Sequence, residues 1–222
     1  MKALIFLISI VLLSLESSPP AFAARRWIGG SAGTGISFLS GGDFHRDLSL
    51  IDGHLKPDYA VRGSLHVRYE LSPAIGLRIH VPGVSRFGAS YTFSEEFDGE
   101  TRAYDGSLRF WTVGPGVDFV FFAGDTRFRP MFAAGFAGMF PYGPFLQEER
   151  SDEIETVRRV NADRFVALHA ISEFGVQYRA NPLSAAASIK YEVPVTRYFS
   201  EHGWPDLRGH GLTVNITIER EI

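Results

Sequence analysis

The chain of 222 residues contains no cysteine. It therefore has no disulfide bonds, no thiolate ligands for zinc, and no modified cysteine that could tether a lipoprotein. Basic residues are not in excess either, because the chain has 22 Lys and Arg and 25 Asp and Glu. This balance does not provide the excess of positive charge that is typical of nucleic-acid-binding proteins. After the N-terminal segment, no stretch reaches the roughly 18 to 20 apolar residues that a membrane-spanning helix needs. If the protein is exported, the lack of disulfide bonds fits an envelope protein whose closed sheet supplies its stability.

The N-terminal segment has the three parts of a secretory signal. Lys2 is the positive residue, residues 3–15 form an apolar core, and Ala21-Phe22-Ala23 is a small-x-small cleavage site. The apolar core is too short to span a bilayer as a helix, although an uncleaved N-terminal anchor is the alternative. We expect a cleaved signal peptide at residues 1–23 and one domain at residues 24–222.

What the chain does contain is alternation. Its 23 Gly, 19 Phe and 8 Tyr indicate an aromatic-rich sheet protein. In the clearest run, residues 59–71, one face has Tyr59, Val61, Gly63, Leu65, Val67, Tyr69 and Leu71, and the other has Ala60, Arg62, Ser64, His66, Arg68 and Glu70. A period of two over this length predicts a strand with one apolar and one polar face.

Seven further runs alternate in the same way: 26–40, 75–93, 108–122, 127–140, 165–178, 183–198 and 211–222. In the run 75–93 the Pro82-Gly83 step predicts a bulge or kink. The apolar face of that run is expected to contain Ile75, Leu77, Ile79 and Val81, then Phe87, Ala89, Tyr91 and Phe93, against Arg78, His80, Gly88 and Ser90.

The connections between the runs alternate between long and short. Short turns are expected at 72–74, 124–126 and 180–182, where Gly, Pro, Asn or Asp suits a tight reversal. The long connections are 41–58, 94–107, 141–164 and 199–210. This rhythm predicts an all-β fold, an eight-stranded antiparallel up-and-down transmembrane β-barrel, with periplasmic termini and turns and extracellular loops.

Alternation alone does not decide which face points outward, and a secreted soluble barrel of the lipocalin kind is the rival. The interior of an eight-stranded barrel holds only its own side chains or one small ligand, so this many Phe, Tyr, Leu, Ile and Val would overfill it. The polar face is rich in small residues, with five charges of each sign that can compensate one another inside. We therefore expect lipid outside and a polar network in the lumen that comprises Arg62, His66, Arg68, Glu70, Arg78, His80, Asp118, Arg129, His169, Glu173, Gln177, Lys190, Glu192 and Glu219.

Six aromatic residues near the strand ends are candidates for interfacial girdles, the alternative being ordinary lipid-facing residues. They are Trp27, Tyr69, Phe93, Trp111, Tyr178 and Phe199.

The chain resembles the small outer-membrane barrels of Gram-negative bacteria, the OmpA/OmpX/OmpW-like group. The most similar portion is the hairpin 119–138, in which Gly124-Asp125 is followed by Phe128-Arg129-Pro130 and a Gly/Ala/Phe alternation, as in OmpW-type barrels. Such barrels commonly end on Phe, whereas this chain ends on Ile222, with Arg220 where an aromatic residue is usual. The resemblance implies insertion into the cell outer membrane by the barrel-assembly machinery, contact with outer-membrane lipid and lipopolysaccharide, and no cofactor. Members of the group range from anchors and adhesins to apolar-solute conduits and lipid-modifying enzymes, so the function stays open.

Histidines and acidic residues are the candidates for chemistry. His66, His80 and His169 fall on the expected inner face, as metal ligands or, in the reading we prefer, as members of the polar network. His45, His54, His202 and His210 lie in or beside the long connections with Ser94, Ser200 and Asp206, but no spacing resembles a nucleophile elbow. The long connections 94–107 and 141–164 are acidic, which suits a divalent-cation or cationic-ligand surface, or a solvated loop.

We therefore expect no catalytic, cofactor or metal residues and no enzyme activity. The expected function is a non-enzymatic outer-membrane barrel with a charge-balanced, plugged lumen, acting in envelope structure or surface contact through acidic loops. The alternatives are a conduit or binder for a small apolar solute and a lipid-modifying enzyme. The segment 147–164, either a helix or a strand extension, is the expected contact site for a surface ligand.

Overall fold

The structure is a computed structural model that describes residues 25–40, 54–97, 100–150, 155–160, 166–196 and 208–222. The expected signal peptide and Phe199 lie outside these ranges, as do His45, His202, Ser200 and Asp206. Among the described residues, no helix is both long and apolar enough to pass through a bilayer.

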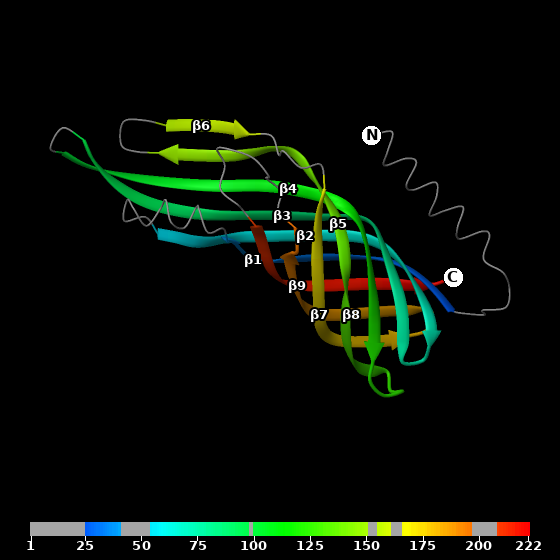
Figure 1. Cartoon of the computed structure of the whole chain (residues 1–222). Helices are drawn as coiled ribbons and strands as arrows, with labels where there is room; N and C mark the ends of the chain where they lie inside the picture. Colours follow the sequence, from blue (N-terminus) through cyan, green and yellow to red (C-terminus); the bar gives the residue numbers. More distant parts are fainter. Residues whose placement is uncertain (1–24, 41–53, 98–99, 151–154, 161–165, 197–207) are drawn as a thin grey trace.

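The described part of the chain consists of antiparallel strands (Figure 1). Their bounds are β1 Arg25–Ser40, β2 His54–Ser72, β3 Ile75–Phe97, β4 Glu100–Phe122, β5 Phe128–Arg150, β6 Glu155–Val160, β7 Ala167–Ala180, β8 Leu183–Pro194 and β9 Arg208–Glu221.

Eight of these strands close into a ring. The order is β4-β3-β2-β1-β9-β8-β7-β5, and β4 also pairs with β5, so the sheet has no free edge within the ring. β6 pairs only with the end of β5, from Phe145 to Arg150, and extends that hairpin beyond the ring. The prediction of an all-β, eight-stranded antiparallel barrel is confirmed.

The short turns lie where the sequence placed them, and we call their end of the barrel the turn side. Gly124 has φ +78°, a left-handed conformation that glycine adopts without steric cost. The start of β1 and the end of β9 meet on this side, because Trp27 pairs with Glu221 and the Ile222 amide donates to the Arg26 carbonyl at 2.9 Å.

The opposite end, the loop side, differs from prediction because the strands run further. Pairing of β3 with β4 continues to Phe97 and Glu100, so the expected loop 94–107 is mostly a β-hairpin. β5 and β6 occupy much of the expected loop 141–164, which shows that the extension interpretation of 147–164, and not the helix, is right for β6. In these polar segments the strands are prolonged by backbone hydrogen bonds alone. An alternation of apolar and polar residues therefore does not predict the extension.

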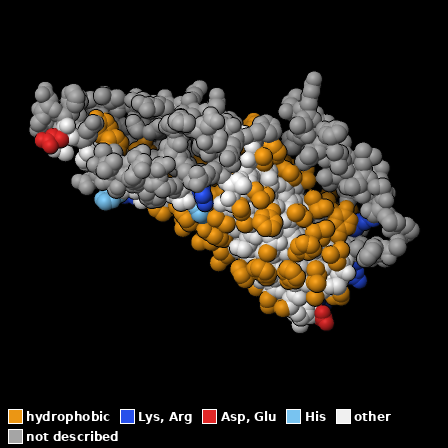
Figure 2. All heavy atoms as spheres, in the orientation of Figure 1, with side chains coloured by type: hydrophobic (Ala, Val, Ile, Leu, Met, Phe, Trp, Pro, Cys, Tyr) orange, Lys and Arg blue, Asp and Glu red, His pale blue; other side chains and the backbone are white. Residues whose placement is uncertain are grey.

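The outer face of the ring is apolar, as Figure 2 shows for the side in view. Large side chains are exposed on every strand of the wall, for example Leu65 at 61%, Phe174 at 62% and Ile216 at 61%. Trp111 and Tyr178 are also exposed, but Trp27 is fully buried, so its expected place in a girdle is wrong. Trp27 has the inward parity of Ser31 and Ser37, and its indole donates to Glu70 at 3.1 Å.

A bulge in β3 reverses which residues face inward. Between His80 and Gly83, β3 has one residue more than β2 and than β4, which confirms the irregularity expected at Pro82-Gly83. Because the side-chain period is two, one extra residue exchanges the faces beyond it. Phe87, Ala89 and Tyr91 are therefore buried inside, and Phe93 packs against them, which corrects the expectation that these four face lipid.

The same reversal puts Arg86 on the outer face. Its guanidinium lies 3.5 Å from the Tyr59 ring centroid and 3.2 Å from Asp58, so the charge is covered and paired and only 3% of the residue is exposed.

Candidate functional site

The lumen is the first candidate site. Every residue of the polar network expected from the sequence is buried in the structure, with an exposed fraction of 8% or less. The network divides into three groups along the barrel axis, each of which joins strands that are not neighbours in the ring. Its functional role stays a prediction.

The central group is built around Arg78 and Glu173. Arg78 of β3 donates to Asp118 of β4 at 2.9 Å and to Glu173 of β7 at 2.5 Å. Lys190 lies 3.0 Å from the same carboxylate, and His80 lies 2.9 Å from Asp118. Two cations and two anions thus neutralise one another, which makes their burial tolerable.

The turn-side group surrounds Glu219 and Glu70. Arg68 donates to Glu219 at 2.7 Å, and His66 lies 3.1 Å from it. Arg179 of β7 donates to Glu70 of β2 at 3.1 Å, which joins strands on opposite sides of the ring. Arg129 and Gln177 belong to this group through a 2.9 Å hydrogen bond.

The third group surrounds Glu192 of β8. Its carboxylate pairs with Arg62 of β2, accepts from Ser85 at 3.1 Å and lies 2.8 Å from His169. The three inner histidines therefore each contact a different carboxylate. Among the described residues, no group of three or more His, Asp or Glu is arranged to hold a metal ion.

The loop side of the lumen is apolar, which the sequence did not reveal. Its lining cluster consists of Leu39, Phe87, Ala89, Tyr91, Leu108, Phe110 and Ala167. Phe87 and Phe110 reach β9, where a Cβ added at Gly209 would lie 2.7 to 2.9 Å from their rings and from the Phe87 Cβ. The two rings are themselves 5.5 Å apart, so this aromatic layer fills the lumen above the ion pairs.

Taken together, the charges lie inside and the large apolar side chains outside, the reverse of a soluble carrier. The chain folds as a small outer-membrane-type β-barrel. No protein-family model and no curated sequence relative matches it.

Solved outer-membrane proteins have a similar architecture. Neisserial surface protein A is 9% identical with a TM-score of 0.42, over 89% of this chain and 97% of that one. OprG from Pseudomonas aeruginosa is 9% identical with a TM-score of 0.42, over 90% and 96%. The outer-membrane protease OmpT from Escherichia coli is 8% identical with a TM-score of 0.46, over 93% and 99%. The fold assignment depends on this chain's own strand order and on the polarity of its two faces.

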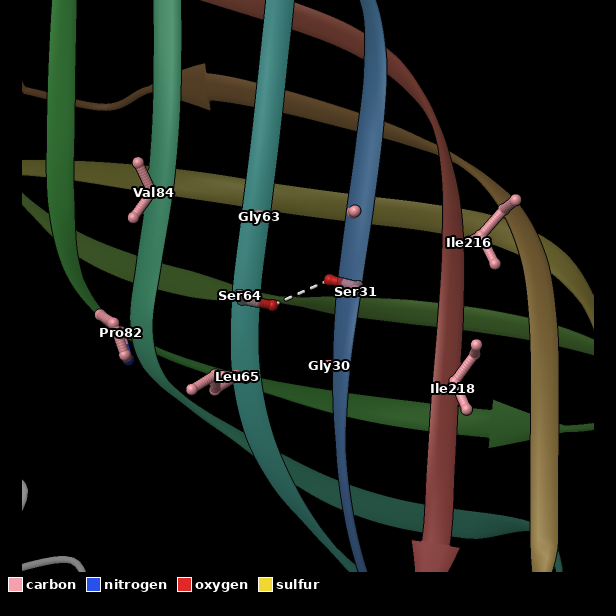
Figure 3. A pocket seen from close by; sticks show the side chains of 10 residues that line it. Gly30, Ser31, Gly63, Ser64, Leu65, Pro82, Val84, Ile216 and Ile218 are labelled. Atoms are coloured by element: carbon pink, nitrogen blue, oxygen red, sulfur yellow. Dashed lines mark hydrogen bonds between the residues drawn. The ribbon is translucent and has the colours of Figure 1, made fainter.

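The outer wall has a shallow apolar groove that spans β9, β1, β2 and β3 (Figure 3). Gly30 and Gly63 form part of its floor, and Leu65, Pro82, Val84, Ile216 and Ile218 flank it. Ser31 and Ser64 turn inward behind it and hydrogen-bond to each other at 2.9 Å. The groove is a shallow depression in the apolar outer face of the barrel.

A second polar site lies on the outer face at the loop side, and sequence reasoning missed it. His210 of β9 lies 2.7 Å from the Ser40 hydroxyl of β1 through Nε2 and 3.1 Å from the Tyr191 hydroxyl of β8 through Nδ1. The sequence groups His210 with serines of the long connections, whereas its partner in the structure, Ser40, is 170 residues away in the chain. Only the β1–β9 register, which sets Phe38 opposite His210, brings the two together. Of the other loop-side candidates, His54 and Ser94 are exposed at strand ends.

Proposed function

We propose that this protein is a β-barrel of the Gram-negative outer membrane that is closed to ions and acts in envelope structure or surface contact through its acidic loop-side segments. Its termini would be periplasmic, it would need no cofactor, and its partners would be outer-membrane lipid, lipopolysaccharide and the barrel-assembly machinery during insertion.

The observation that supports closure is that ion pairs cross the lumen at several heights. Arg179–Glu70 joins β7 to β2, Arg78–Glu173 joins β3 to β7, and Arg62–Glu192 joins β2 to β8. Above them the Phe87 and Phe110 rings press against β9. A hydrated ion that passed through would have to displace pairs that are buried and mutually neutralised, and leaving one partner unpaired is costly.

Planar lipid bilayers test the closure. The purified barrel should give no stable single-channel steps, whereas the double variant Arg78→Ala/Glu173→Ala, which removes a cross-lumen pair without changing the net charge, should give discrete steps. Stable currents from the native barrel would refute a plugged lumen. Slower migration after heating on a denaturing gel shows that each sample is folded.

Epitope insertion tests the orientation. A tag between Phe97 and Glu100, at the tip of the β3–β4 hairpin, should be labelled by antibody on intact cells. A matched tag at Gly124-Asp125 should be labelled only after the outer membrane is permeabilised. The opposite pattern would place the termini outside.

The apolar loop side of the lumen favours one second candidate, a binder for a small apolar solute. Any solute would have to displace Phe87 and Phe110, because these rings already occupy the space. The double variant Phe87→Ala/Phe110→Ala should then bind an apolar fluorophore more tightly than the native barrel, and equal or weaker binding would remove this candidate.

A further inference from the structure

The hydrogen-bonded residues Ser40, His210 and Tyr191, which we call the seam triad, lie side by side on the outer face of the barrel. Both imidazole nitrogens of His210 have a hydroxyl partner, Ser40 at 2.7 Å and Tyr191 at 3.1 Å. The Phe38 ring stacks on the imidazole with centroids 5.0 Å apart and an interplanar angle of 9°. The ring of His210 is therefore held in one plane, with Nε2 directed at a serine hydroxyl. All three residues of the triad are partly exposed, so an external molecule can reach them.

The height of the seam triad places it at the edge of the hydrocarbon. Along β1 the outward residues run from Ile28, near the turn side, to Phe38, ten residues later. Ten residues rise about 33 Å along a strand, or about 25 Å along the membrane normal at a tilt near 40°, which equals the height of the apolar band of such barrels. Ser40 is the next outward residue. It thus lies where the acyl chains of the loop-side leaflet meet their headgroups, the level at which fatty-acyl ester bonds occur.

We propose that the seam triad is a hydrolytic site for acyl esters of lipids in the loop-side leaflet. Ser40 Oγ attacks the ester carbonyl carbon while His210 Nε2 takes the hydroxyl proton. The C–O bond to the alcohol then breaks, and His210 returns the proton to the leaving alkoxide. A water molecule, deprotonated by His210, attacks the acyl-Ser40 ester and releases the fatty acid together with free Ser40. No oxidant, reductant or cofactor is required for these steps.

Tyr191 completes the arrangement, and Arg208 lies on the same face. When His210 Nδ1–H donates to the Tyr191 hydroxyl, Nε2 is left as the acceptor that a general base needs, so Tyr191 is a positioning residue. Arg208 pairs with Ser40 in the β1–β9 register and has the same outward parity as His210. A cation on this face can favour the negative charge that develops on the carbonyl oxygen of the ester during attack.

This proposal departs from the expectation of a non-enzymatic protein, and it is independent of the plugged lumen. The site lies on the outer surface, so a barrel that conducts no ions can still hydrolyse lipid. Equally, a leaky lumen would leave the seam triad intact.

A serine-directed fluorophosphonate probe tests the nucleophile in the folded barrel in detergent micelles. The native protein should be labelled at Ser40, and labelling should fall at least tenfold in Ser40→Ala and in His210→Asn. Ser94→Ala, at the loop-side end of β3, is the matched control and should be labelled like the native protein. Labelling that is absent from the native barrel, or unchanged in Ser40→Ala, overturns the proposal.

Hydrolysis of a long-chain p-nitrophenyl ester in the same micelles tests turnover. We expect product release by the native protein, loss in Ser40→Ala, and a several-fold lower kcat with an altered pH profile in Tyr191→Phe, which keeps the ring and removes the hydroxyl. Labelling without any release of p-nitrophenol would overturn hydrolysis. Heat-modifiable migration checks that each variant is folded, and His210→Gln replaces His210→Asn if that variant does not fold.

Discussion

At the scale of single residues, the lumen shows why buried charge is tolerated here. Each carboxylate of the network has at least one cation at hydrogen-bond distance, and Glu173 has two, Arg78 and Lys190. Ser188 also donates to Glu173 at 2.6 Å. Removal of one member leaves its partners buried without compensation, which costs more than the intact pair contributes.

Glu173 is therefore the residue of the network whose substitution should lower the free energy of unfolding most. Substitution of Glu173 by Gln should lower the free energy of unfolding by about 3 to 5 kcal/mol, because Arg78 and Lys190 keep their charges in a buried place. Guanidinium titration of the detergent-solubilised barrel, followed by tryptophan fluorescence, measures the change. Glu96→Gln, at an exposed position near the end of β3, is the control and should change stability by less than about 0.5 kcal/mol. A similar loss in both variants would contradict the compensation argument.

At the scale of strands, the bulge in β3 has the largest effect on what the lumen contains. Without it, Phe87 and Tyr91 would face lipid and Arg86 would enter the lumen. With it, one strand contributes Arg78 and His80 to the ion-paired part and Phe87 to the aromatic layer.

Single cysteines can test the reversal cleanly, because the native chain has none. A bimane label on Ile79→Cys, below the bulge, and on Ser90→Cys, above it, should be quenched by doxyl-labelled lipid. The matched positions Gly76→Cys and Ala89→Cys are buried inside and should be shielded. Quenching at position 89 together with shielding at position 90 would show that the faces do not exchange.

The sequence predicted the strands whose two faces differ in polarity and the short turns between them. It predicted the inner positions of Arg78, Asp118 and Glu192 for the same reason, since each lies in a stretch where the period of two is unbroken. It could not predict what depends on pairing between strands. Trp27 is expected in a girdle because it is aromatic, although its position in the alternation of β1 is an inward one. The inward position of Phe87 depends on the number of extra residues at Pro82-Gly83, which is visible only in the pairing of β3 with β2 and β4. The Ser40–His210 contact depends on the register between the first and last strands, which local sequence does not contain.

At the scale of the whole molecule, closure of the ring depends on the pairing of β1 with β9 from Trp27–Glu221 to Ser40–Arg208. An open sheet of the remaining strands would have two unpaired edges, and unpaired backbone groups are not tolerated in hydrocarbon.

Deletion of residues 208–222 should therefore abolish the heat-modifiable form and leave the chain open to added protease. Deletion of residues 145–160, which removes β6 and the part of β5 that pairs with it, is the matched control and should leave the ring folded. A protease-resistant, heat-modifiable barrel without β9 would show that another pairing closes the sheet.

The pairing of β1 with β9, which closes the ring, also brings Ser40 of β1 into contact with His210 of β9. A chain still in transit across the periplasm has both residues but not their juxtaposition. The proposed hydrolase would thus be inert until it is fully inserted, a safeguard for the inner membrane that requires neither a pro-segment nor an inhibitor.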